Sequence, residues 1–284
     1  MAGGELTPFS KGSAIVYGLN QDRVIKLFSP LYSGNWANEK RVLNFLGDRL
    51  PVATPKVVFE GCHEGWPYMI MNRLPGMPLV EVWDTLPRSV RLQLCRDAGR
   101  LLRHLHGLSI DGLDLDQPFW PQFLETRTGE LEAHHRANGT GMAWIAQMTG
   151  FVAKTPWAEA RPLVLLHTEF MRDHLLVART GDGWCLTGLI DFEPSMVGDG
   201  EYDFASAALF VAGGEFGLLR AFLDGYGLAG TGMTDGLRHR IMSYILIHRY
   251  SNLDWYLSFM PGCPEAETLD ELMDAWLCFE ASGP

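Results

Sequence analysis

The stretch that decides the fold reads LVLLHTEFMRDHLLV over residues 163–177 and LTGLIDFE over residues 186–193. Each half sets a short, continuous apolar run beside charged residues. Apolar runs of this length are consistent with buried strands, and polar side chains concentrated between two such strands indicate a cleft and not a core. We therefore expect one functional loop over His167–His174 and a second at Asp191 and Glu193.

The chain before this stretch has the pattern of a small lobe that mixes strands with one helix. Residues rich in β-branched and aromatic side chains alternate with turn residues, and one apolar stripe at helical spacing ends at Pro51. The pattern predicts the order β-β-α-β-β, with a hairpin first. The expected strands are residues 14–17, 24–28, 56–59 and 68–71, and the expected helix covers residues 38–50.

A connector rich in proline and glycine follows, and the chain then becomes mainly helical. The periodicity stops at Arg73–Leu79, where Pro75, Gly76 and Pro78 stand close together. We expect residues 1–72 to form the first lobe, 73–79 the connector and 80–284 a larger helical lobe. Helices are expected at residues 88–108, 204–226, 236–260 and 265–279.

Composition restricts the class of protein. The formal net charge of -11 argues against a nucleic-acid binder, which needs a basic surface to neutralise phosphates. Five scattered cysteines without a C-x-x-C pair indicate neither a disulfide framework nor a zinc site. Residues 1–8 have no pattern of a secretory signal, and no apolar run reaches the roughly 18 residues of a membrane span. We expect a cytoplasmic protein without a membrane partner.

A lysine in the first lobe is the first candidate for chemistry. Lys26 lies in the middle of the apolar strand over residues 24–28, where an unpaired charge would be costly. Glu39, on the following helix, is its expected partner. Gly12 and Ser13 stand where the hairpin opens, and backbone N–H groups there could approach a phosphate. Asp191 and Glu193 fall on one face at a period of two and suit an oxygen-preferring cation such as Mg²⁺.

Taken together, these features resemble the aminoglycoside phosphotransferase and choline kinase-like family over roughly residues 10–260. The resemblance rests on the order and spacing of four features: Lys26 with Glu39, the connector MIMNRLPGMPL at 69–79, the loop 167–174, and IDFE at 190–193 followed by GD and YD. It implies an α+β, bilobal, protein-kinase-like fold with a small β-rich N-lobe and a larger, mostly helical C-lobe.

The same resemblance implies roles for individual residues. Lys26 would hold the phosphates of ATP or GTP, with Glu39 orienting it, and Asp191 would bind the Mg²⁺ that bridges those phosphates. Met71 and Arg73 would present backbone groups to the nucleobase. The implied reaction is transfer of a phosphoryl group to a hydroxyl, for which a protein supplies mainly positioning and positive charge.

The catalytic loop departs from the family pattern. The family has His-x-Asp-x-x-x-x-Asn, and this chain has His167, Glu169 and His174 at those places. We expect Glu169 to be the catalytic base, His167 and Asp191 to be catalytic as well, and His174 to occupy the second metal position beside Asp191. Three interpretations follow: an active kinase with a coadapted loop, a kinase that uses one well-held metal ion or Mn²⁺, and a nucleotide-binding pseudokinase.

The acceptor is expected to be a small cationic molecule. Acidic and aromatic residues near the loop suit a polyamine sugar or a quaternary amine, although a packed helix pair explains the same residues. The resemblance to hygromycin-type phosphotransferases favours an aminoglycoside, and a metabolic acceptor such as choline, homoserine or an amino sugar is the alternative. We expect a monomer or dimer, with His134 and His135 on the surface. The acceptor candidates are Glu201, Asp203, Asp254, Trp255 and Tyr256.

Overall fold

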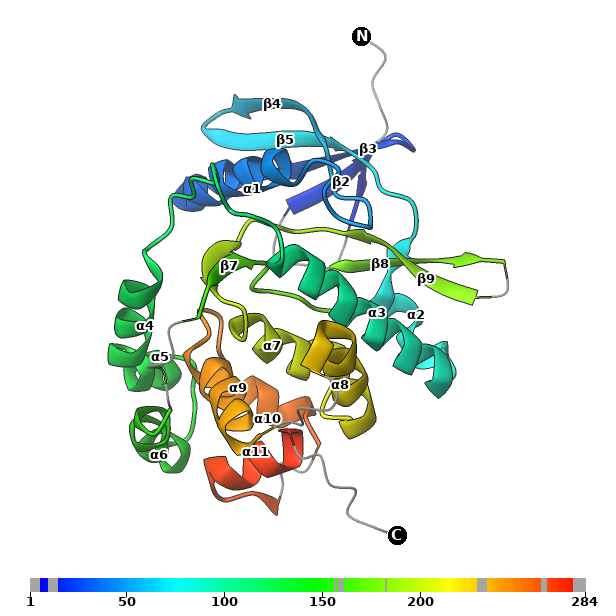
Figure 1. Cartoon of the computed structure of the whole chain (residues 1–284). Coiled ribbons are helices and arrows are strands. Elements are labelled where there is room, and N and C mark those ends of the chain that lie inside the picture. The colour runs from blue at the N-terminus through cyan, green and yellow to red at the C-terminus, as the bar shows by residue number, and fades with distance from the viewer. Residues whose placement is uncertain are drawn as a thin grey trace.

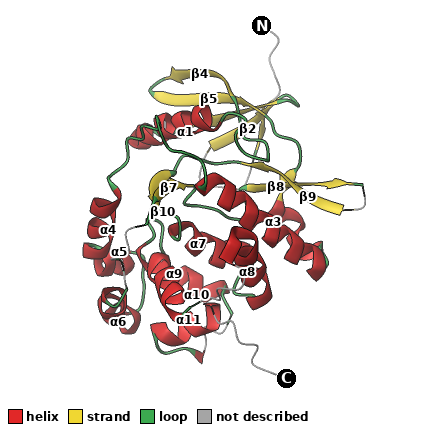
Figure 2. Ribbon diagram, viewed as in Figure 1, coloured by secondary structure: helices red, strands yellow, loops and turns green. Residues whose placement is uncertain are grey.

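The structure is a computed structural model, and it describes residues 6–9, 15–155, 157, 161–181, 183–228, 234–261 and 265–277. The fold is α+β and bilobal, as the sequence predicts. A lobe built on an antiparallel sheet lies above a larger lobe that is mostly helical (Figures 1 and 2). The two expected loops of the functional site lie where these lobes meet.

The N-lobe is a five-stranded antiparallel sheet with one long helix. The strand order is β1-β2-β3-β5-β4, and β3 pairs with β5 so that Lys26 lies opposite Met69. Because side chains alternate along a strand, Val24 and Lys26 point to the same face of the sheet. The elements are β1 (Leu6–Pro8), β2 (Ile15–Leu19), β3 (Arg23–Leu27), α1 (Ser33–Leu46), β4 (Val57–His63) and β5 (Trp66–Asn72), with a 3₁₀ turn at Pro30–Tyr32.

The C-lobe contains the remaining helices and two small sheets. One sheet pairs β7 with β10, and the other has the order β6-β8-β9. Its strands are β6 (Met77–Pro78), β7 (Leu163–Leu166), β8 (Leu175–Thr180), β9 (Gly183–Leu189) and β10 (Met196–Asp199). Its helices are α2 (Leu79–Val82), α3 (Arg88–His106), α4 (Trp120–Gly129), α5 (Leu131–Ala137), α6 (Met142–Ala153), α7 (Tyr202–Ser206), α8 (Phe216–Leu223), α9 (Asp235–Ile247), α10 (Leu253–Phe259) and α11 (Leu269–Leu277).

Several expected elements differ in the structure. The helix expected over 204–226 is interrupted by π-helical segments at Ala207–Ala212 and Asp224–Leu228, and the helix expected over 236–260 is broken between α9 and α10. Helices α4, α5 and α6 were not predicted at all. His135 was expected on the surface but is fully buried, where its Nε2 lies 2.9 Å from the carbonyl oxygen of Leu246.

Helix α3 packs unusually close to the end of α8 and the segment after it. A Cβ atom at Gly99 of α3 would collide with the carbonyl oxygen of Phe222, and one at Gly225 would collide with that of Arg96. Both positions therefore require glycine so that the two backbones can approach. This contact fixes α3, whose last residue, His106, supports the catalytic loop.

The two lobes are also connected by backbone pairing. The N–H of Ala53 donates to the carbonyl of Thr187, and the N–H of Leu189 donates to the carbonyl of Ala53, each at 3.0 Å. The segment between α1 and β4 thus holds the end of β9, two residues before Asp191. The expected division into residues 1–72, 73–79 and 80–284 remains a prediction, and these contacts across it show that the lobes are tied together close to the site.

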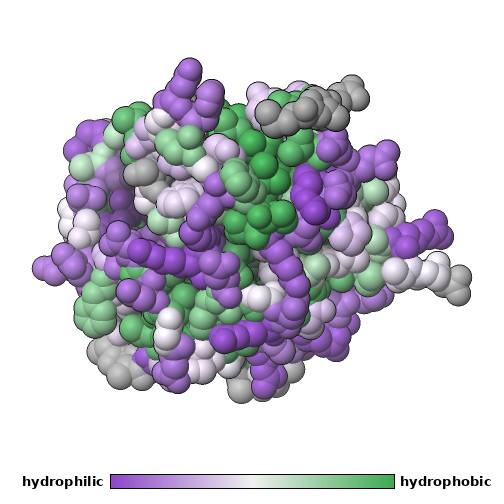
Figure 3. Space-filling view, turned by 90° about the horizontal axis from the view of Figure 1, so that it is seen from above, coloured by the Kyte–Doolittle hydropathy of each residue, from purple (hydrophilic) through white to green (hydrophobic). Residues whose placement is uncertain are grey.

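The view from above shows a surface of mixed polarity (Figure 3). Hydrophobic residues gather near the middle of this face, with hydrophilic residues around them. Among the described residues, no helix has both the length and the apolar character needed to cross a membrane. The exposed large hydrophobic residues of the N-lobe are Leu6, Phe9, Ile15, Leu31, Val58, Phe59 and Trp66.

Candidate active site

Lys26 lies at the centre of a cluster of three carboxylates. Its Nζ is 2.8 Å from Glu39 Oε2, 2.7 Å from Asp191 Oδ1 and 3.0 Å from Glu193 Oε2. Strand β3 places the lysine, α1 places Glu39, and the segment after β9 brings both other carboxylates from more than 160 residues away. The expected Lys26–Glu39 pair is therefore formed, and it is part of a larger cluster.

Burial and charge act against each other in this cluster. Burial would lower the pKa of Lys26, but the three carboxylates raise it well above its usual value. Burial raises the pKa of Glu39 to about 7, although Lys26 opposes the shift. Burial would raise the pKa of Asp191, but Lys26 and His174 hold it well below the usual range. At neutral pH the cluster thus retains a cationic Lys26 and an ionised Asp191.

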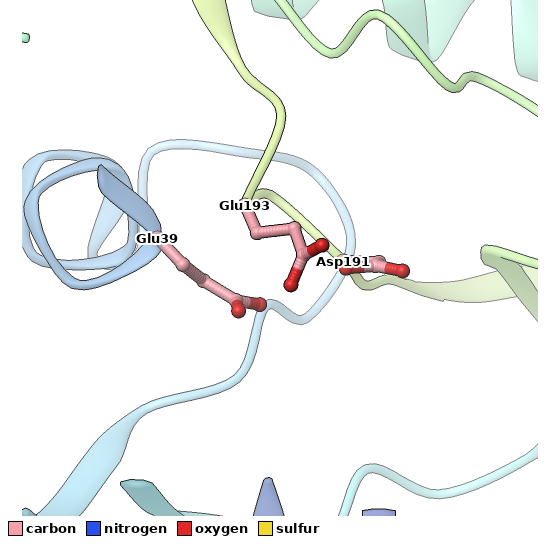
Figure 4. Close-up of side chains that lie close together, drawn as sticks. All are labelled: Glu39, Asp191 and Glu193. Atoms are coloured by element: carbon pink, nitrogen blue, oxygen red, sulfur yellow. The ribbon is translucent and has the colours of Figure 1, made fainter. Parts of the chain in front are cut away.

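The same carboxylates fit a divalent cation. One oxygen from each of Glu39, Asp191 and Glu193 can be chosen so that all lie within 4.8 Å of one another. In Figure 4, Glu39 extends from α1 toward the other two, which follow one another closely along the chain. Carboxylate oxygens are the ligands Mg²⁺ prefers, and a single ammonium does not neutralise three of them. Asp191 and Glu193 are the residues we propose to hold Mg²⁺, while Glu39 orients Lys26.

Helix α1 also supports the loop that bears these carboxylates. The Nδ2 of Asn38 donates to the carbonyl oxygens of Glu193 and Ser195 at 2.9 and 2.8 Å. Asn38 is buried, and its bond to Ser195 lies out of water. Sequence reasoning missed this residue, since an asparagine one position before Glu39 gives no signal until the loop is placed against the helix.

The catalytic loop is held from below by Asp203. This carboxylate accepts hydrogen bonds from the backbone N–H of His167 at 2.8 Å and of Thr168 at 2.6 Å, and lies 3.0 Å from His106 Nε2. Asp203 was expected to be an acidic residue in the first turn of a helix or an acceptor ligand. It does lie in the first turn of α7, but it is fully buried and cannot contact an acceptor.

Two backbone positions next to the site are strained. Thr168 has φ of 70° and Asp191 has φ of 69°; a β-branched residue such as Thr168 rarely adopts this left-handed region, whereas aspartate adopts it more readily. Such strain costs roughly 1–3 kcal/mol per residue and persists only where surrounding contacts impose it. The contacts at Thr168 are the Asp203 bond to its N–H and two bonds to its carbonyl, from Ser206 Oγ at 2.9 Å and His248 Nε2 at 3.0 Å.

His167 lies beneath the loop and not at its surface. Its side chain is fully buried, with Nε2 3.0 Å from the carbonyl oxygen of Ile190, the residue before Asp191. Burial lowers its pKa to about 4, so the ring is neutral and Nε2 donates this bond. We therefore assign His167 a positioning role between the two loops, in place of the direct catalytic role expected from the sequence.

Glu169 is the loop residue with the properties of a base. It is half-buried, and burial raises its pKa to about 6. His174 and Arg249 oppose this rise, whereas Asp191 and Glu193 add to it. A carboxylate with a pKa near the working pH can take a proton and release it again.

His174 bridges the two loops. Its Nδ1 lies 2.8 Å from the carbonyl oxygen of Glu169, and its Nε2 lies 3.2 Å from Asp191 Oδ2. Burial would lower its pKa, but Asp191 raises it to about 9. Both nitrogens thus face oxygen atoms in this arrangement, and neither offers a lone pair to a metal ion. The metal-binding role expected for His174 stays a prediction, and its contacts favour a role in holding Asp191.

Four further residues were expected to contact the nucleotide: Met71 and Arg73 at the nucleobase, and Gly12 and Ser13 at the phosphates. Met71 is buried in β5, and the N–H of Arg73 donates to the carbonyl of Asp22 at 2.9 Å. The backbone of the connector is thus ordered by the β2–β3 turn, and its contact with a base stays a prediction. Gly12 and Ser13 lie outside the described residues.

The acceptor candidates fall into two groups. Glu201 pairs with Arg161 and Arg240 at 2.5 and 2.6 Å, so it stabilises the C-lobe and is not free for an acceptor. On α10, Trp255 and Phe259 are exposed and stack with Phe210, at centroid distances of 5.6 and 5.9 Å. Asp254 is also exposed. The second group provides an aromatic surface with an acidic residue beside it.

We expect Asp203→Asn to loosen the catalytic loop. An amide has one oxygen where the carboxylate has two, so at least one buried N–H loses its acceptor, which costs about 2 kcal/mol. The melting temperature should fall by about 5 °C, and turnover should fall with it. Asp114→Asn, on an exposed loop, is the control and should change neither quantity. Equal melting temperatures for the two variants would contradict the role assigned to Asp203.

Known structures share this architecture. The GDP and kanamycin complex of APH(2")-IIIa is 17% identical, with 96% of this chain and 93% of that chain covered and a TM-score of 0.72. The streptomycin–ATP–APH(2")-IIa ternary complex is 18% identical, with 94% and 92% covered and a TM-score of 0.64. ADP-bound aminoglycoside phosphotransferase APH(2'')-Ib is 18% identical, with 99% and 96% covered and a TM-score of 0.64. At these identities the similarity shows a shared fold.

The fold and the site define a kinase-like phosphotransferase: a Lys–Glu pair in a β-rich lobe faces two loops that bear carboxylates. The family profile of the phosphotransferase enzyme family matches residues 5–239. The chain belongs to this family, and the resemblance read from the sequence is confirmed.

Proposed function

We propose that this protein is a nucleotide-dependent O-phosphotransferase that phosphorylates a hydroxyl of a small cationic molecule, with an aminoglycoside-type antibiotic as the first candidate. The observation that carries the proposal is the contact of Lys26 with Glu39 and Asp191, next to a loop whose Glu169 has the pKa of a base. Structures with the same fold hold GDP with kanamycin and ATP with streptomycin. Cytoplasmic location and a monomer or dimer belong to the same proposal.

The residues divide the chemistry among them. Lys26 would turn from Asp191 and Glu193 to the phosphates of ATP or GTP, while Glu39 keeps hold of its ammonium. Asp191 and Glu193 would hold Mg²⁺ or Mn²⁺, and the ion would supply positive charge to the phosphates. Glu169 accepts the proton of the acceptor hydroxyl as its oxygen bonds to phosphorus and the bond to the leaving diphosphate breaks. His167, Asp203 and His174 hold the two loops in position relative to each other.

The proposed base predicts a limb in the pH profile. Glu169 must be ionised to accept a proton, and burial raises its pKa to about 6. We expect kcat/KM to fall about tenfold per pH unit below that value as the carboxylate becomes protonated. Measurement of kcat/KM from about pH 5 to about pH 8 checks this, and a flat profile through about pH 6 would remove Glu169 from the role.

The first test is nucleotide consumption by the purified protein. Each of ATP and GTP is combined with Mg²⁺ or Mn²⁺ and a panel of aminoglycosides that includes hygromycin B. Consumption that depends on an acceptor, with a phosphorylated acceptor in the mass spectrum, supports the proposal. If no acceptor works but nucleotide still raises the melting temperature, the acceptor assignment fails. Choline, homoserine and amino sugars are then the next panel, and silence there leaves a nucleotide-binding pseudokinase.

A further inference from the structure

One asparagine of helix α1 bonds to the segment that carries the proposed metal-binding carboxylates. The Nδ2 of Asn38 donates to the carbonyl oxygens of Glu193 and Ser195, at 2.9 and 2.8 Å, so both of its protons are used. Among the described residues, none donates a hydrogen bond to the buried Oδ1 of Asn38. A buried amide oxygen without a donor destabilises the fold. What this asparagine contributes is therefore its pair of donors.

The turn that these bonds hold is fixed from both lobes. Ser195 closes the turn, since its N–H donates to the carbonyl of Phe192 at 3.2 Å. The carbonyl between the two that Asn38 holds belongs to Pro194, and it accepts from Thr168 Oγ1 at 3.2 Å. Thr168 belongs to the catalytic loop. Three successive carbonyls thus bond alternately to α1 and to the catalytic loop.

The carboxylate of Glu193 is held by the N-lobe as well. Its Oε2 lies 3.0 Å from Lys26 Nζ, and its Oε1 accepts from Asn35 Nδ2 at 3.4 Å. Asn35, Asn38 and Glu39 are spaced three and four residues apart, so they lie on one face of α1. The face that supplies Glu39 to Lys26 therefore also holds the backbone and the side chain of Glu193.

The metal ion has few protein ligands in this chain, so the position of each one matters. Asp191 and Glu193 are the proposed ligands, and both nitrogens of His174 already face oxygen atoms. Mg²⁺ demands nearly octahedral geometry, with ligand oxygens at about 2.0–2.1 Å. A small displacement of the turn would therefore take Glu193 out of coordinating distance, whereas Asp191 keeps its own contact with His174.

We propose that Asn38 is a positioning residue for the metal ion: through the carbonyls of Glu193 and Ser195 it fixes the Glu193 carboxylate where it can coordinate. This rests on the proposed phosphotransferase function, with Mg²⁺ or Mn²⁺ as its cofactor. Asn38 belongs to the N-lobe and the turn belongs to the C-lobe, so metal affinity is coupled to the docking of α1 on the C-lobe. The coupling is reciprocal, and bound metal strengthens that docking in turn.

The test is a titration of the full chain with Mn²⁺ in the presence of ADP or GDP. Free ion is measured by electron paramagnetic resonance, and a protein-free titration is subtracted to correct for the complex of Mn²⁺ with nucleotide. Asn38→Ala removes both donors, and we expect its dissociation constant for Mn²⁺ to rise about 10-fold to 100-fold, as is usual when a group that orients a metal ligand is lost. In turnover assays the Mg²⁺ concentration for half-maximal rate should rise similarly, while kcat at saturating Mg²⁺ stays close to that of the wild type.

Leu46→Ala is the matched control for loss of stability. Leu46 is fully buried in the same helix and lies eight residues, or roughly 12 Å, along it from Asn38. The variant opens a cavity and lowers the melting temperature, but its Mn²⁺ affinity should equal that of the wild type. Asn38→Leu keeps the bulk of the side chain without its donors. It should repeat the effect of Asn38→Ala, and it replaces that variant if the smaller side chain unfolds the lobe.

Three results would overturn the assignment to Asn38. The first is unchanged Mn²⁺ affinity in its variants, and the second is an equal loss of affinity in Leu46→Ala, which would show that metal affinity follows the stability of α1. The third is a fall in kcat that excess Mg²⁺ does not restore. A wild-type chain that takes up no Mn²⁺ with either nucleotide would instead refute the metal-dependent function on which the assignment rests.

Discussion

Replacement of Glu169 by glutamine is expected to lower kcat by about 10³-fold while nucleotide affinity stays nearly constant. Glutamine keeps the size of the side chain but cannot accept the proton of an acceptor hydroxyl. The structure adds a reason to expect intact folding: burial disfavours the charge of Glu169, and no described side chain forms an ion pair with it. The neutral variant should therefore unfold at the same temperature or slightly higher.

The measurement is turnover at saturating nucleotide, together with nucleotide binding by titration. Glu169→Asp is the informative companion, because it restores the family residue and withdraws the carboxylate by one methylene. A loop coadapted to glutamate should lose activity in this variant, since misplacement by about 1 Å can cost on the order of 10²-fold. Undiminished turnover in Glu169→Gln would show that another group takes the proton, and an active Glu169→Asp would show that the loop tolerates both lengths.

Local sequence signals were sufficient for most of the N-lobe, although the edge strand β1 was not predicted. The hairpin of β2 and β3, the strand β5 and the helix α1 were all predicted, because alternation and helical periodicity are properties of short segments. The helix begins at Ser33 and ends at Leu46, earlier at both ends than predicted, with Gly47 at φ of 49° just after it. The pairing of Lys26 with Glu39 could be predicted because a buried lysine needs a partner of opposite charge in any fold.

The C-lobe was harder to predict because its order depends on distant contacts. Helix α4 has little amphipathic pattern, and Pro121 in its first turn was the available signal for its start. The burial of His135 depends on a carbonyl of α9, 111 residues away. Helices α9 and α10 are separated by a break after Ile247. The hydrophobic periodicity over residues 236–260 gives no sign of this break. These features depend on tertiary contacts, and the local pattern of a single sequence does not reveal such contacts.

The site shows the same division. The residue types of Glu169, Asp191 and Glu193 could be read from two short motifs, and their approach to Lys26 could be inferred from the resemblance. Asp203 was visible as an acidic residue near a helix start, but its bonds to the N–H groups of His167 and Thr168 cross more than 30 residues. The partners of a buried carboxylate cannot be chosen from sequence when several backbone donors compete for it.

Lys26→Met is expected to abolish turnover and to destabilise the fold. Removal of the ammonium leaves the buried Glu39 beside Asp191 and Glu193, with no cation at the centre of the cluster. Breaking a buried ion pair in this way costs about 3–5 kcal/mol. We expect nucleotide affinity to fall as well, since the phosphates lose their lysine. Urea unfolding and nucleotide titration measure the two effects separately.

The pH dependence of that loss identifies its cause. Without Lys26, the pKa of Glu39 in the folded state lies still further above its unfolded value, because the charge that opposes the rise is gone. A carboxyl with a raised folded pKa loses stability as pH rises above its unfolded pKa, so the deficit of Lys26→Met should be larger at about pH 8 than at about pH 6. Adding Glu39→Gln removes the unpaired charge, and the double variant should regain stability without regaining turnover. A deficit that is independent of pH and unaffected by Glu39→Gln would show that packing, and not the buried carboxylate, makes the fold depend on Lys26.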